Sequence, residues 1–243
     1  LELSVSDIYL TWSQTLPTQQ ITFNVRKKKN PPCTYFITFS NGGASNYNRR
    51  MTKGSAHLNY QLYKESSLTN ILKELPDATS PNDVIGGSIG FGKDITVTHT
   101  FFLHVPLNLA TTPRLKPSGV YTDNFLVKVY QTAQNSDSPE DSESVRVTTY
   151  IPKNIQLSLV NSGSSFDPND TTQHLDFGVL TEGKTRSFDL RALSNAGYLI
   201  SFSSQNNGVL KHSKPSVTTT VPYTLSVNGV VKNLRSSRTS PVV

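Results

Sequence analysis

The 243-residue sequence predicts an all-β protein made of two antiparallel β-sandwiches in tandem. Apolar and polar residues alternate along most of the chain, a pattern that places the apolar side chains on one face of a strand. Segment 35–40 (YFITFS) recurs 163 positions later as 198–203 (YLISFS), which indicates two related modules. Charged residues make up only 16% of the chain, and Ser, Thr and Asn are abundant. That composition is typical of extracellular β-sandwiches.

The alternation predicts strands in both halves of the chain. In the first half they lie at 1–5, 21–25, 35–39, 58–62, 95–97, 101–107 and 120–130. In the second half they lie at 145–151, 155–159, 175–177, 187–190, 198–202 and 221–227. Segment 66–75 (SSLTNILKEL) fits a helix or a short hairpin strand equally well, and Asn-Gly pairs between strands favour tight turns.

Segment 134–144 (QNSDSPEDSES) is polar and acidic and contains Pro139, so we predict an exposed linker there. The expected organisation is a first domain at 1–133, a linker at 134–144 and a second domain at 145–243. First-copy strands continue to about Val129, whose counterpart in the second copy would lie beyond Val243. We therefore expect the second sandwich to lack its last strands.

No motif in the sequence predicts catalysis, a metal site or a cofactor site. The five histidines (His57, His99, His104, His174 and His212) lack the HExxH spacing, and there is no Gly-x-Ser-x-Gly elbow. Segment 167–170 (DPND) lacks the downstream glutamate of a calcium loop and fits a turn. The glycine-rich segment 86–92 is not followed by Lys-Ser/Thr, so a phosphate loop is not expected.

The net charge is +6 and the pI is about 9.3, with the basic residues dispersed except at 26–29 (RKKK). This run could bind phosphate or lipid headgroups, or it could be a solvated turn before Pro31-Pro32. It has no interleaved aromatic residues, so a nucleic-acid partner is not expected. The single Cys33 is compatible with a buried inert side chain, a free thiol or a partner outside this chain. No apolar run reaches 18 residues.

Several motifs resemble one known family. Segment 48–51 (NRRM), followed by 58–63 (LNYQLY), resembles the signature of the spore coat protein U, or secreted pilin, domain. Segment 117–123 (PSGVYTD) resembles that family's final strand. In the second half, 175–178 (LDFG) and 194–198 (SNAGY) look like the early strands of another such domain. The family usually pairs an early cysteine with one near Cys33, and this sequence has no such partner.

This resemblance implies a subunit of an archaic (Csu-type) chaperone–usher pilus of Gram-negative bacteria. Pilin domains of the family are incomplete immunoglobulin-like sandwiches that are completed by a donor strand. A periplasmic chaperone supplies that strand first and a neighbouring pilin subunit later, at an outer-membrane usher. A two-domain subunit resembles the tip adhesin, with a binding domain first and a pilin domain second. We thus expect a non-enzymatic adhesin that crosses the periplasm to the pilus tip and mediates attachment to abiotic or host surfaces and biofilm formation.

Exposed apolar residues in loops are the candidates for surface contact. If the strand at 120–130 runs toward the linker, loops 13–20, 41–56 and 108–118 face away from the second domain, and insertion 64–94 could add a fourth. The candidate residues are Leu16, Pro17, Tyr47, Val84, Ile85, Ile89, Phe91, Leu109 and Leu115. Each of them could instead pack into the end of the sandwich.

Two other functions remain open at this point. One is a non-tip structural subunit or minor adaptor of the pilus. The other is a secreted carbohydrate-binding module, which would show exposed aromatic residues on one sheet face.

Overall fold

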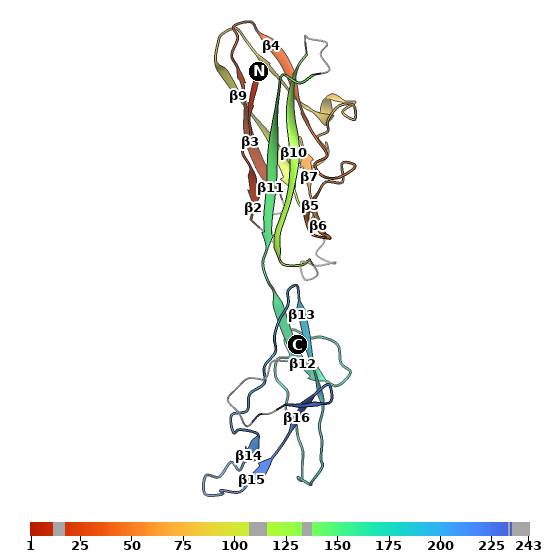
Figure 1. The fold of residues 1–243 in the computed structure, drawn as a ribbon, viewed down its shortest axis with the longest axis vertical. Helices are drawn as coiled ribbons and strands as arrows, with labels where there is room; N and C mark the ends of the chain where they lie inside the picture. Colours follow the sequence, from red (N-terminus) through yellow and green to blue (C-terminus); the bar gives the residue numbers. More distant parts are fainter. Residues whose placement is uncertain (12–17, 107–115, 133–137, 233, 235–243) are drawn as a thin grey trace. The chain divides into compact units, whose positions relative to one another are not determined.

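The computed structural model describes residues 1–11, 18–106, 116–132, 138–232 and 234. All regular elements in these ranges are β-strands except one short 3-10 helix, η1 (Pro81–Asp83), which confirms the all-β class (Figure 1). Ser80 caps η1 by accepting a hydrogen bond from the Asn82 N–H at 3.2 Å. The segment 66–75 contains no helix, only turns and an isolated bridge between Tyr63 and Ile71.

The first domain is a sandwich of two sheets. One sheet has the order β1 (Glu2–Ser4), β3 (Thr18–Lys27), β9 (Ile95–His104) and β7 (Gln61–Tyr63). The other has the order β2 (Ile8–Leu10), β11 (Asp141–Ile151), β10 (Gly119–Gln131), β4 (Cys33–Phe39) and β8 (Ile85–Ile89). Two short strands, β5 (Arg50–Lys53) and β6 (Ala56–Asn59), pair with each other, and β5 also pairs with β10.

The N-terminal segment contributes to both sheets of this sandwich. Its first strand, β1, is antiparallel to β3, and its second, β2, is parallel to β11. All other strand pairs in the domain are antiparallel. Two antiparallel sheets joined in this way form an immunoglobulin-like sandwich.

The core lies between the two sheets and follows the alternation in the sequence. On β10 every second residue from Tyr121 to Val129 is buried, and the residues between them face outward. Phe23, Phe39, Phe101 and Phe125 make edge-on or tilted ring contacts at the centre, with centroids 5.1–6.4 Å apart. Burial of these rings stabilises the domain together with the aliphatic side chains of the same core.

Strand β11 belongs to the β2–β11–β10–β4–β8 sheet of the first domain, although its residues 145–151 were predicted to open the second domain. It pairs with β10 from Gly119↔Ile151 to Val129↔Asp141, and its side chains Val145 and Val147 are fully buried. The polar segment 134–144 thus ends inside β11 and connects two hairpin strands. Alternation identifies a strand but not its partner, which is why the sequence placed β11 in the wrong domain.

Beyond β11, the described residues form three separate two-stranded antiparallel sheets. They are β12 (Ile155–Asn161) with β13 (Phe188–Ser194), β14 (Val209–Lys211) with β15 (Thr220–Pro222), and β16 (Leu225–Val227) with β17 (Val230–Lys232). By its contacts the chain divides into two compact units, Leu1–Asn195 and Ala196–Val243. Strands were predicted at 175–177 and 198–202, and neither segment is one. Ile200 forms an isolated bridge, but no described strand pairs with either segment, so most backbone groups of an extended strand would lack partners there.

Candidate surface-binding site

The predicted surface residues lie in different environments. Leu16, Pro17, Leu109 and Leu115 lie outside the described residues. Ile85 and Ile89 are buried in the core, which corrects their assignment to an exposed loop. They lie on β8, where every second residue points inward, so the glycine-rich stretch is an edge strand. Val84 is half-buried at the end of η1.

Tyr47 is half-buried, and its side chain is engaged inside the first domain. Its hydroxyl accepts a hydrogen bond from the Glu74 N–H at 2.8 Å, and its ring lies 4.9 Å from the Arg49 guanidinium carbon. Burial raises the pKa of this hydroxyl. Of the predicted residues that the structure describes, Phe91 alone has a large, fully exposed side chain, with 79% of its surface accessible.

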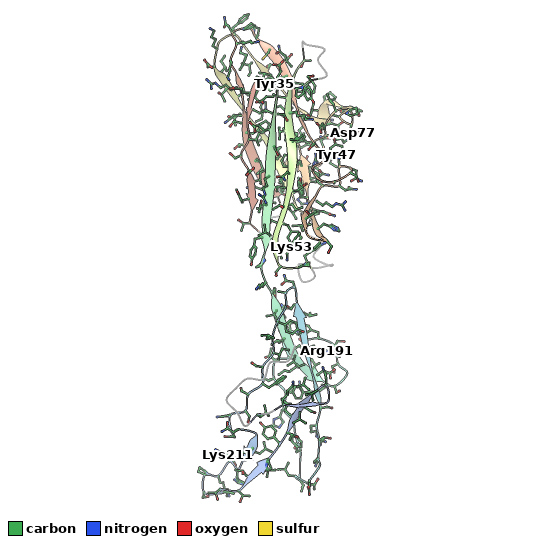
Figure 2. The ribbon with its side chains drawn as sticks, in the orientation of Figure 1. Tyr35, Tyr47, Lys53, Asp77, Arg191 and Lys211 are labelled. Carbon is green, nitrogen blue, oxygen red and sulfur yellow. The ribbon has the colours of Figure 1, made fainter. Side chains whose placement is uncertain are left out.

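The strand directions reverse the predicted placement of the loops. Because β11 returns along β10, the chain leaves the sandwich at Ile151, beside the first residue of β10, Gly119. The ends of β2, β3 and β9 that bound loops 12–17 and 105–118 lie at this same end, which we call the exit end. The opposite end, which we call the distal end, carries the turns after Lys27 and Ile89. Figure 2 shows Tyr35 toward the distal end and Lys53 toward the exit end.

Two turns meet at the distal end: residues 28–32 between β3 and β4, and residues 90–94 between β8 and β9. We call them the distal loop pair. Lys27, which precedes the first turn, is buried at the inward end of β3. Its ammonium group donates to the carbonyl oxygens of Asn30 at 3.2 Å, Pro31 at 2.8 Å and Gly90. Three carbonyl acceptors match the three N–H donors of a lysine, so this buried cation joins the two turns.

A second set of hydrogen bonds holds the backbone on the other side of Phe91. The Gly92 N–H donates to the backbone oxygen of Asn30 at 3.1 Å and to its side-chain oxygen at 2.9 Å. Gly92 has a φ of +126°, and a Cβ there would lie 2.8 Å from Ile95 Cδ1, so glycine is required. Phe91 is thereby fixed between Gly90 and Gly92, each tied to the turn at 28–32. Hydrogen bonds therefore hold the backbone on both sides of the exposed Phe91 ring.

Several charged residues lie in the two turns of the distal loop pair and on the strands next to them. Arg26 forms an ion pair with Asp94 at 2.8 Å, and Lys28 pairs with Glu2. Lys29 and Lys93 are exposed and have no ion pair among the described residues. The distal loop pair therefore combines one exposed aromatic residue with an excess of positive charge. The sequence showed the basic run and Phe91 separately. Only Lys27 indicated that the two turns meet, because it continues the inward alternation of Phe23 and Val25.

The motif at 48–51 has a structural role. Arg49 is fully buried, and it donates to the carbonyl oxygens of Ser40 at 2.9 Å, Phe39 at 3.1 Å and Leu72 at 2.7 Å. Burial lowers the pKa of this guanidinium to about 10. Nearby, the Tyr60 hydroxyl donates to Asp123 at 2.8 Å, and burial together with this carboxylate raises the pKa of Tyr60. These contacts hold the 40–49 loop against the core, so they are not available to a ligand.

No group of His, Cys, Asp or Glu side chains in the described ranges is arranged to hold a metal ion. The same ranges contain no helix long and apolar enough to span a membrane.

Comparison with known proteins agrees with this fold and these motifs. Residues 9–128 match the family model of the Spore Coat Protein U domain. The first domain is a Spore Coat Protein U domain. Its family signature is explained by the structure: Arg49 and Met51 are buried, and Tyr60 anchors Asp123. The match ends within β10. Strand β11 follows the matched region and lies between β10 and β2 in the sheet.

Solved structures with a similar arrangement include three pilus proteins. The CssB subunit of enterotoxigenic Escherichia coli colonization factor CS6, complemented with a donor strand from CssA, is 13% identical, with a TM-score of 0.34, over 62% of this chain and 97% of that one. CfaE, the adhesive subunit of the CFA/I fimbria of enterotoxigenic E. coli, is 13% identical, with a TM-score of 0.35, over 61% of this chain and 48% of that one. The CupB6 tip adhesin of Pseudomonas aeruginosa is 9% identical, with a TM-score of 0.30, over 60% of this chain and 41% of that one. A search of curated proteins found no match.

Proposed function

We propose that this chain is the adhesive subunit at the tip of a chaperone–usher pilus, without catalytic activity. The observation that carries this proposal is the unequal burial of apolar side chains. Of the 28 buried hydrophobic residues in the described ranges, 26 lie between Leu3 and Ile151. Of the 19 exposed large hydrophobic residues, 13 lie between Ile155 and Val231. The first domain is closed by its own residues, whereas the region after it leaves apolar surface uncovered.

The sheet of β12 and β13 is the best candidate for completion by another protein. One of its faces is apolar, and the residues on it are Ile155, Leu157, Leu159, Phe188, Leu190 and Ala192. Ile155 and Leu157 remain 47% and 44% exposed. Neither β12 nor β13 pairs with any other described strand. On the outer edge of β12, Leu159 donates to Asp170 at 2.7 Å and accepts from Gln173 at 2.7 Å, so the outer edge of β13 is the better candidate for strand addition. An added strand would bond to such an edge and place alternate apolar side chains on this face, at ~25 cal/mol per Å² of apolar area covered.

A periplasmic chaperone would supply that strand first, and a neighbouring pilin subunit would replace it at the outer-membrane usher. The first domain needs no such strand, because β11 contributes Val145, Val147 and Ile151 to its core. A self-contained domain is free to bind a target while the following region joins the pilus. The proposed location is accordingly the cell-surface pilus tip, reached through the periplasm, and the proposed role is attachment to abiotic or host surfaces in biofilm formation.

Attachment would use the distal loop pair with Phe91 at its centre. The test is adhesion to polystyrene by bacteria whose pili carry Phe91→Ala, with Leu126→Ala as the matched control. Leu126 is 38% exposed on β10, away from the distal end. We expect Phe91→Ala to reduce adhesion several-fold at an unchanged number of pili, and Leu126→Ala to have no effect. Unchanged adhesion with Phe91→Ala would favour a non-tip structural subunit.

One observation favours a carbohydrate-binding role as a second candidate. Tyr9 and Tyr150 are 71% and 53% exposed on the outer face of the β2–β11–β10 sheet. Tyr9 lies beside Thr148, and Tyr150 is two residues further along β11, so the two rings are diagonal neighbours. Exposed aromatic rings among hydroxyl groups suit the apolar face and the hydroxyls of a sugar. Saturable binding on a glycan array that is lost in Tyr9→Ala/Tyr150→Ala would support this role, and no sugar binding by the wild-type chain would eliminate it.

A further inference from the structure

The charge of the distal loop pair is not explained by attachment to neutral apolar surfaces. Its carboxylate Asp94 is already paired with Arg26, and Glu2 on the neighbouring β1 is paired with Lys28. The buried Lys27 donates to three carbonyl oxygens, and no carboxylate among the described residues contacts its ammonium group. Of the further carboxylates on nearby strands, Asp141 accepts from the Leu3 N–H at 2.8 Å, and the half-buried Glu143 lines the same hollow as Arg26.

The positive charge that is left lies next to the exposed ring. Lys29 is adjacent in sequence to Asn30, which bonds to Gly92, and Gly92 lies between Phe91 and Lys93. One exposed lysine therefore lies on each turn, close to the backbone of Phe91, and the buried Lys27 that joins the two turns adds a third positive charge. An anionic partner with an apolar layer would complement this arrangement in both charge and hydrophobicity.

We propose that the distal loop pair binds lipid bilayers that carry anionic headgroups, with Phe91 entering the interface and Lys29 and Lys93 lying over the headgroups. This inference rests on the proposed attachment role of the same residues. A single protruding aromatic side chain flanked by cations suits a bilayer, where amphipathic and aromatic groups enter the headgroup region and basic residues gain from the surface potential. A single-stranded nucleic acid would instead require a basic groove with successive aromatic platforms. Phe91 is the one exposed aromatic residue in these two turns.

The rigid presentation of Phe91 increases the expected affinity. The hydrogen bonds of Lys27 and Asn30 fix the backbone before binding, so less conformational entropy is lost when the ring inserts. Each basic residue near an anionic membrane contributes about fivefold in binding, so the two exposed lysines together account for roughly 25-fold. Because these charges are exposed, their contribution is expected to fall as salt is added.

The experiment is sedimentation of the full chain with vesicles of phosphatidylcholine alone or of phosphatidylcholine mixed with phosphatidylglycerol. The variants are Phe91→Ala, Phe91→Ser and Lys29→Gln/Lys93→Gln, and Lys153→Gln/Lys214→Gln is the charge-matched control because both of its lysines are exposed elsewhere. We expect binding to the mixed vesicles only. Binding should be lost in both Phe91 variants, reduced roughly 25-fold in the Lys29/Lys93 variant and unchanged in the control.

Three results would overturn the proposal: equal binding to both vesicle types, equal binding by the Lys29/Lys93 variant and its control, or vesicle binding that survives loss of Phe91. Competition by heparin together with insensitivity to Phe91→Ala would identify a polyanion site instead. The polystyrene assay separates this inference from the proposed function. Loss of adhesion in Phe91→Ala without any vesicle binding would leave attachment standing and refute the lipid inference, whereas vesicle binding without a Phe91 effect on adhesion would refute the proposed attachment role.

Discussion

Replacement of Arg49 by Met is expected to destabilise the first domain strongly. The substitution removes the guanidinium donors to the carbonyl groups of Ser40, Phe39 and Leu72, which lie 2.7–3.1 Å from guanidinium nitrogens. A buried acceptor left without a donor costs about 1–3 kcal/mol, so three would cost about 3–9 kcal/mol. Burial already penalises this cation, as its pKa of about 10 indicates, and removing it returns part of that cost.

The expected net loss is about 3 kcal/mol, which corresponds to a decrease in Tm of about 6–12 °C for a domain of this size. Differential scanning calorimetry of the full chain measures it, since the first domain holds nearly all of the buried apolar residues and should give the main transition. Arg50→Met is the matched control, because Arg50 is the next residue and is exposed. Equal Tm values for the two variants, or a decrease below about 2 °C in Arg49→Met, would refute the assigned role of the buried guanidinium.

Two further predictions concern stability. Val147→Ala should lower the free energy of unfolding by about 1–3 kcal/mol, because Val147 is fully buried on β11. The control Ser144→Ala, on the outer face, should change it by less than about 0.5 kcal/mol. Urea denaturation measures both, and equal effects would argue against β11 as a core strand. The His99 ring bonds to the Tyr35 hydroxyl at 2.7 Å, and burial lowers the pKa of His99. The unfolded chain then binds more protons, so stability should be full above the unfolded pKa of about 6.5 and fall as the pH decreases below it. His99→Gln should flatten this fall in thermal melts at a series of pH values and His57→Gln, at an exposed site, should not; an unchanged profile in His99→Gln would contradict the assignment.

The sequence identified much of the first domain correctly because its strands are half-buried. Alternation marked β3, β4, β9 and β10, whose inward residues form the core. It could not assign partners, since pairing depends on the direction in which the chain returns. That is why β11 was placed in the second domain, and the error reversed which loops were expected at the free end of the sandwich.

The binding site was less accessible to sequence reasoning. Ile85, Ile89 and Phe91 lie within seven residues, and only the register of β8 on β4 separates the two core residues from the exposed one. The basic run 26–29 and Phe91 are about 60 residues apart, and their contact depends on hydrogen bonds from Lys27 to carbonyl oxygens. Backbone acceptors exist at every residue, so no sequence pattern indicates which of them a lysine will reach.

The division between a self-closed first domain and an uncovered region after it is tested most directly by hydrogen–deuterium exchange. The full chain would be compared alone and after co-expression with a periplasmic pilus chaperone. We predict rapid exchange at 155–161 and 188–194 in the free chain, strong protection of these strands in the complex, and equal, slow exchange of β10 and β11 in both samples. Slow exchange of β12 and β13 in the free chain, or exchange that the chaperone leaves unchanged, would contradict the account.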